Sequence, residues 1–149
     1  MIWPAIPYLP GQTPRPAEGV FDALKGGLDG LDPAGLADSA CFRAGFEAFD
    51  RRLYWEAHEL WEPVWLRLPE GAERALVQGV IQLANCGLKR RMGRVQAAMR
   101  IIPLAEAALA RAYAGGVAVM GVSRSRVTGM QEIATRELQY NAESDLTKG

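Results

Sequence analysis

The sequence has little of what usually marks a metalloenzyme or a disulfide-stapled scaffold. Its 149 residues contain a single histidine, His58, and only two cysteines, Cys41 and Cys86, which form no CxxC pair. One histidine excludes the zinc-protease arrangement, because that chemistry needs two imidazoles one helical turn apart. We interpret the cysteines as small buried apolar groups of a protein in the reducing cytoplasm.

The sequence also lacks an excess of either charge and any long apolar run. Seventeen Lys and Arg residues balance seventeen Asp and Glu residues, so no net charge attracts nucleic acid or anionic lipid. The basic run from Lys89 to Arg94 is interpreted as a solvated helix end, because helix C-termini favour cations. No stretch approaches the roughly 20 apolar residues of a membrane span, and the N-terminus lacks the basic start of a signal peptide. We expect a cytoplasmic protein that binds no nucleic acid and no membrane.

Strand patterns are missing too, since no segment alternates apolar and polar residues and no internal repeat is visible. Apolar residues recur at helical spacing instead, and Asp32 followed by Pro33 is typical of a helix start. The expected fold class is all-α, a single-domain antiparallel bundle of about five helices within residues 20–149. The five predicted helices run from Pro33 to about Arg52 with room for an interruption at Gly35, from Tyr54 to about Leu66, from Pro69 to about Arg91, from Arg94 to about Ala114, and from about Thr128 to Asn141.

The N-terminal segment is rich in proline, with five prolines among the first sixteen residues. Proline fixes φ and lacks a backbone donor, so residues 1–19 are expected to form an extended, polyproline-like arm. A free tail would expose Trp3 and Tyr8, so the arm either covers its own domain or reaches onto a neighbouring subunit. We expect a homo-oligomer. A stripe of small residues on the helix after Arg94 fits either close packing within the chain or a subunit interface.

The segment Leu53–Trp65, LYWEAHELWEPVW, has the most unusual composition. It holds three of the four tryptophans, the only histidine and three glutamates. On a helical wheel, one sector contains Tyr54, Trp55, His58, Trp61, Glu62 and Trp65. Glu59 lies beside this sector, and Glu56 is predicted to face water on the opposite side. His58 and Glu62 would then sit among aromatic rings, where an unpaired polar group costs about 1–3 kcal/mol.

The next predicted helix offers partners for these polar groups. Gln78 and Gln82 lie on one face of it, and a short loop favours antiparallel packing against the preceding helix. We therefore predict that His58 and Glu62 hydrogen-bond to Gln78 or Gln82 across a polar pocket. Pro63 either kinks the helix predicted from Tyr54 to about Leu66, which frees the Glu59 carbonyl, or it starts a new helix.

The motifs YWEAHELWEPVW and LVQGVIQLA resemble those of a family called domain of unknown function 309. The family pattern has an aromatic pair, Glu-Ala-His-Glu, a further acidic residue, a tryptophan and then Gln-Gly-x-x-Gln-x-Ala. These positions fall here on Tyr54, Trp55, Glu56, Ala57, His58, Glu59, Glu62 and Trp65, then on Gln78, Gly79, Gln82 and Ala84. The similarity covers about Phe46 to Ala112, and Pro63 departs from the pattern. The resemblance implies a compact all-helical domain and implies no activity.

Several functions fit these residues. We predict a non-catalytic module that binds a small molecule or a protein through His58, Glu59, Glu62, Gln78 and Gln82, with no cofactor and no assigned catalytic residue. One alternative is a metal-dependent or acid–base hydrolase that uses the H-E-x-x-E sequence of His58, Glu59 and Glu62. The other alternative is a purely structural network of polar side chains that fixes the packing of the helices.

Overall fold

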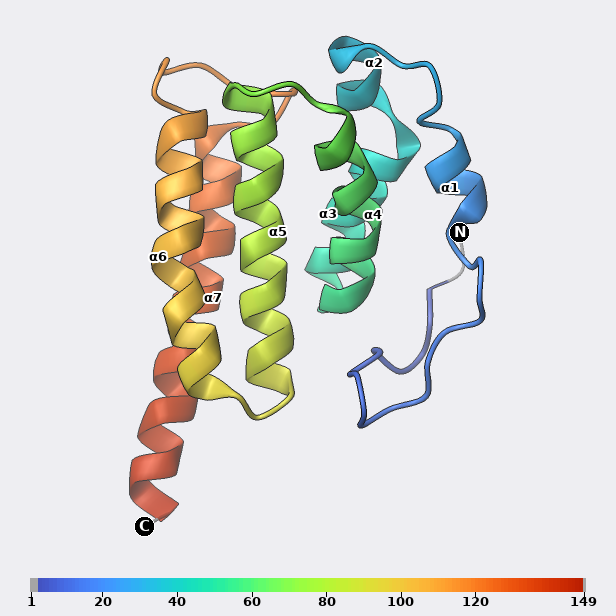
Figure 1. Ribbon diagram of the computed structural model, residues 1–149. Helices are drawn as coiled ribbons and strands as arrows, with labels where there is room; N and C mark the ends of the chain where they lie inside the picture. The colour runs from blue at the N-terminus through green and yellow to red at the C-terminus, as the bar shows by residue number, and fades with distance from the viewer. Residues whose placement is uncertain (1–2, 149) are drawn as a thin grey trace.

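The structure, a computed structural model, describes residues 3–148, with side chains described as far as Gln139. In this part of the chain all regular elements are helices, which confirms the all-α prediction (Figure 1). They are α1 (Asp22–Gly26), α2 (Pro33–Asp38), α3 (Ala40–Asp50), α4 (Tyr54–Arg67), α5 (Ala72–Arg91), α6 (Val95–Ala112) and α7 (Arg124–Lys148). Helices α4 to α7 run in alternating directions. None of the described helices is both long and apolar enough to cross a membrane.

The described residues form more helices than the predicted five because a short helix, α1, precedes Pro33 and because the segment after Pro33 is divided. Asp32 caps α2 as predicted, and its side chain accepts a hydrogen bond from the Gly35 backbone at 2.8 Å. The break falls at Ser39 rather than Gly35. Ser39 has an extended backbone, and its hydroxyl accepts from the Phe42 N–H while donating to the Leu36 carbonyl. Serine thus ends one helix and caps the next.

The contact between α5 and α6 is the most extensive in the bundle. A Cβ atom added to Gly79 would lie 2.5 Å from Cδ2 of Leu109, so only glycine allows this approach. Four small residues of α6 are buried against the core: Ala98, Ala105, Ala108 and Ala112. This part of the small-residue stripe therefore serves close packing within the chain.

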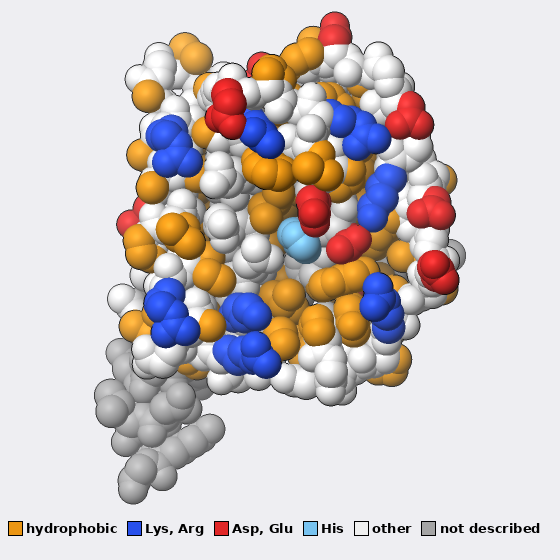
Figure 2. Space-filling view, in the orientation of Figure 1, with side chains coloured by type: hydrophobic (Ala, Val, Ile, Leu, Met, Phe, Trp, Pro, Cys, Tyr) orange, Lys and Arg blue, Asp and Glu red, His pale blue; other side chains and the backbone are white. Residues whose placement is uncertain are grey.

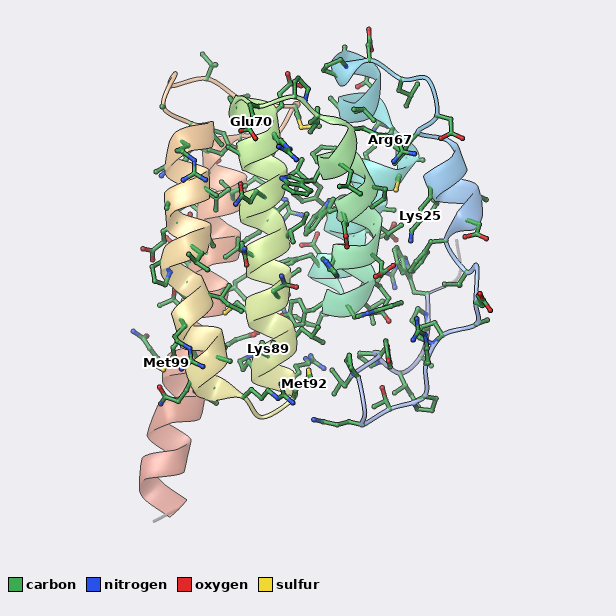
Figure 3. The ribbon with its side chains drawn as sticks, viewed as in Figure 1. Lys25, Arg67, Glu70, Lys89, Met92 and Met99 are labelled. Atoms are coloured by element: carbon green, nitrogen blue, oxygen red, sulfur yellow. The ribbon has the colours of Figure 1, made fainter. Side chains whose placement is uncertain are left out.

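The N-terminal arm lies on its own domain, beside α4 and the end of α5. The Tyr8 backbone N–H donates to a Glu56 carboxylate oxygen at 3.3 Å, and the Tyr8 ring packs edge-on against Trp55. Farther along the arm, the Gln12 side-chain amide donates to the Met92 carbonyl at 3.1 Å (Figure 3). Of the two predicted arrangements, the structure contains the intramolecular one.

Both cysteines are buried, and burial raises the pKa of each thiol to about 11. Because the thiolate is the reactive form, we expect neither Cys41 nor Cys86 to react rapidly with Ellman's reagent at pH 8 in the folded protein. In denaturant, both thiols should react rapidly. Rapid modification of a native thiol would contradict the buried placement.

Candidate functional site

Helix α4 buries a different side from the one that its aromatic residues suggest. Its buried arc contains Tyr54, Glu56, Ala57, Leu60, Trp61 and Val64. Three members of the predicted inward sector, Trp55, His58 and Trp65, are only half-buried, and Glu62 is exposed. The prediction that this whole sector faces the core is therefore wrong. The aliphatic positions of α4 pack against α3 and α5, and this packing sets the rotation of the helix.

Trp61 is the aromatic residue of the sector that lies deepest. Its side chain is fully buried, and its indole N–H donates to the Phe42 carbonyl at 3.1 Å. Phe46 and Phe49 pack against the same ring. Trp61 therefore joins α3 to α4 and belongs to the core rather than to a binding surface.

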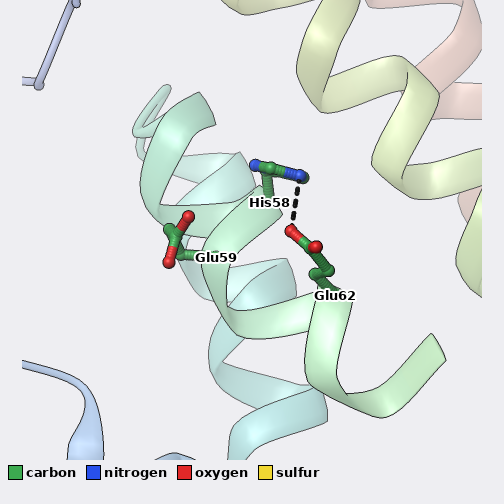
Figure 4. Close-up of side chains that lie close together, drawn as sticks. All are labelled: His58, Glu59 and Glu62. Carbon is green, nitrogen blue, oxygen red and sulfur yellow. Dashed lines mark ion pairs between the residues drawn. The ribbon is translucent and has the colours of Figure 1, made fainter. Parts of the chain in front are cut away.

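His58, Glu59 and Glu62 form a cluster on the open side of α4. Nε2 of His58 lies 3.0 Å from Oε2 of Glu62, a close contact between residues four positions apart (Figure 4). The His58 side chain is 27% exposed and that of Glu62 48%, so both reach solvent. Figure 2 shows the histidine near the middle of one face, beside two acidic side chains and close to apolar ones.

Glu59 connects the cluster to α1. Its Oε2 lies 3.1 Å from Nζ of Lys25, which extends from α1 toward α4 (Figure 3). The two side chains also line a hollow of about 400 Å³ under the arm, together with Trp55 and Arg15. Glu59 is therefore shared between the His58 cluster and the pairing with Lys25.

The geometry of the cluster suits a cation. One potential ligand atom from each of His58, Glu59 and Glu62 lies within 4.8 Å of the others. Ligands at about 2.1 Å from one ion lie roughly 3–3.5 Å from one another. For all three to bind the same ion, the side chains would have to rotate and Glu59 would have to leave Lys25. Pro63 lies inside the continuous helix α4 and gives no N–H to the Glu59 carbonyl, so that oxygen lacks its usual helical donor.

The two glutamines do not meet this cluster in the predicted way. Gln78 and Gln82 are half-buried on α5, and in the described part of the chain neither one hydrogen-bonds to His58 or Glu62. His58 pairs with Glu62 on its own helix instead, which removes the need for a partner on α5. Gln78 lines a separate hollow together with Trp65. The predicted hydrogen bonds across the helix pair are therefore wrong.

Glu56 is buried, which contradicts the prediction that it faces water. Its side chain is fully buried. One carboxylate oxygen accepts the N–H of Tyr8, and the other has no hydrogen-bond partner among the described residues. Burial raises the pKa of this carboxyl, and the backbone hydrogen bonds that it accepts partly offset the shift. The arm covers the side of α4 that a helical wheel assigns to solvent.

A comparison with protein families finds a similarity over this region. Residues 42–101 match the family model of DUF309, a domain of unknown function. This match confirms the resemblance seen in the α4 and α5 motifs. The DUF309 segment runs from Phe42 in α3 through α4 and α5 to Ile101 in α6, so it contains all five predicted site residues. No curated protein and no solved structure matches the chain.

Proposed function

We propose that the protein is a non-catalytic binding module whose ligand engages His58, Glu59 and Glu62. The observation that supports the proposal is the grouping of three ligand atoms within 4.8 Å on side chains that remain accessible. A purely structural network would be sealed and fully satisfied. Gln78 and Gln82 stay predicted binding residues on the neighbouring helix.

The chemistry of the cluster favours a divalent cation as the ligand. Two carboxylates and the unprotonated ring nitrogen of a neutral imidazole supply acceptor atoms, and such mixed oxygen and nitrogen sets bind zinc, manganese or iron. The Lys25 ammonium pairs with Glu59. Cation binding would therefore have to displace Lys25 from Glu59.

A metal-dependent hydrolase is the second candidate. Three protein ligands on a half-open surface leave coordination positions for water, and such open positions distinguish catalytic metal sites from structural ones. Acid–base hydrolysis by His58 and a carboxylate is the metal-free version of this candidate. Elemental analysis of protein purified without metal-affinity resin separates these versions. Stoichiometric metal would support the metal-dependent one, and a blank result would remove it.

His58→Ala and Glu62→Gln should each weaken cation binding at least tenfold, because each removes one of the three ligands. We expect both variants to unfold cooperatively at nearly the wild-type temperature, since the two side chains are partly exposed. The measurement is calorimetric titration with Zn²⁺ and with Mn²⁺. Glu47→Gln, on the exposed face of α3, is the matched control and should bind like wild type. If the wild-type protein takes up neither ion, the cation proposal is wrong.

A further inference from the structure

A second hollow lies where α4 ends and α5 begins. Its volume is about 340 Å³, and α4, α5 and α6 all contribute to its walls. The polar side chains that line it are Trp65, Glu70, Arg74, Gln78 and Arg111. It shares no residue with the His58, Glu59 and Glu62 cluster and, of the predicted binding residues, includes only Gln78, so the inference does not depend on a ligand at that cluster.

Donors dominate this hollow. Arg111 makes no ion pair with any residue that the structure describes, and the Gln78 side chain makes no hydrogen bond there. The indole nitrogen of Trp65 is buried and has no hydrogen-bond partner in the described part of the chain. The first turn of α5, which no side chain caps, lines the same hollow and adds N–H groups that favour anions.

Arg74 is held in place beside these donors. Its guanidinium stacks over the Trp65 ring at 4.1 Å, and its Nε lies 3.4 Å from the Trp65 carbonyl oxygen. A planar guanidinium fixed by stacking loses little freedom when it binds an anion. Arg74 therefore presents a largely preorganised positive charge.

Glu70 supplies the only acidic side chain of the lining. Its carboxylate pairs with Arg74, yet its side chain is 89% exposed at the start of α5 (Figure 3). An exposed ion pair of this kind contributes little to stability. Two guanidinium groups against one exposed carboxylate leave the hollow with a net positive charge.

We propose that this hollow binds the carboxylate or phosphate group of a small anionic molecule. Arg111 and Arg74 provide charge-assisted hydrogen bonds, which are stronger than neutral ones, and Gln78 adds an amide donor. When no anion is bound, the Glu70 carboxylate pairs with Arg74. When an anion binds, the Glu70 side chain moves out into solvent. The anion and the Glu70 carboxylate thus compete for the same guanidinium group.

The proposal is tested by titrating ¹⁵N-labelled protein with inorganic phosphate and, separately, with acetate. We expect saturable shifts of the Gln78 amide and Trp65 indole signals, and the tighter-binding anion identifies the preferred group. Arg111→Gln should weaken binding at least tenfold without affecting the fold, because Arg111 is exposed and forms no ion pair within residues 3–139. Glu70→Gln should strengthen binding severalfold, since it removes the competing carboxylate.

Arg100→Gln is the matched control, an exposed arginine on the same helix as Arg111 but outside the hollow. It should change the dissociation constant less than twofold. The proposal is overturned if neither anion causes saturable shifts. It is also overturned if Arg100→Gln weakens binding as much as Arg111→Gln, or if Glu70→Gln fails to strengthen it.

Discussion

Gly45→Ala should lower the free energy of unfolding by about 3 kcal/mol or more, although it adds only one methyl group. The added Cβ would lie 2.1 Å from Nε1 and 2.4 Å from Cε2 of Trp61. The Trp61 ring is fully buried and donates to Phe42, so it cannot move without losing packing and a hydrogen bond. Overpacking a core costs about 1–3 kcal/mol and sometimes more, and this contact lies well inside van der Waals distance.

The measurement for Gly45→Ala is urea unfolding followed by tryptophan fluorescence, together with thermal unfolding. A loss of this size should lower Tm by about 6–12 °C in a domain of this length. Gly129→Ala in α7 is the matched control, because a Cβ there would have no neighbour within 4 Å. Alanine is favoured over glycine inside a helix by roughly 0.5–1 kcal/mol, so the control should be slightly stabilised. A Gly45→Ala variant within 1 kcal/mol of wild type would show that α3 and α4 can separate freely.

Local signals predicted most of the helix boundaries. The helix expected from Tyr54 to about Leu66 is α4, which ends one residue later at Arg67. The helix expected to start at Pro69 begins at Ala72 instead, because Gly71 adopts a φ of 151° that is incompatible with a helix. The last helix was predicted near Thr128 to Asn141, and α7 extends beyond it at both ends. The position of a helix boundary depends on the backbone conformation of single loop residues. The spacing of apolar residues along the sequence does not predict that conformation.

The part of the candidate site that is local in sequence could also be predicted. His58 and Glu62 are one helical turn apart, so any helix through them brings the two side chains together. Pro63 does not change this, since α4 continues through it as one helix. The pairing of Glu59 with Lys25 could not be predicted, because it depends on where α1 packs.

Contacts between distant segments account for the errors. The prediction for Glu56 assumed that the side of α4 away from the aromatic residues faces water. That side is covered by an arm that lies 48 positions earlier in the chain. The arm's apolar residues indicated that it covers something, but no local pattern identifies its target. The Gln78 prediction failed similarly, because the rotation of α5 against α4 is fixed by the packing of the whole bundle.

The buried carboxyl of Glu56 should make the stability of the protein depend on pH. Burial raises its pKa above the ordinary value of 4.5, so the folded state holds a proton that the unfolded state releases. Where the native state binds more protons, stability falls as pH rises. This contribution of Glu56 is therefore fully present below pH 4.5 and is lost as pH rises through the raised pKa of the folded state.

Glu56→Gln should remove this dependence, because glutamine keeps an acceptor for the Tyr8 N–H but cannot ionise. From pH 4 to pH 8, the free energy of unfolding of the wild type should fall relative to that of the variant. The fall should be at most about 1.4 kcal/mol per pH unit. Urea unfolding at several pH values measures this difference, in which the other titrating groups cancel. Glu132→Gln, on the exposed face of α7, is the control. Its free energy of unfolding should change with pH in parallel with that of the wild type. Parallel curves for Glu56→Gln would instead mean that water reaches the carboxyl beneath the arm.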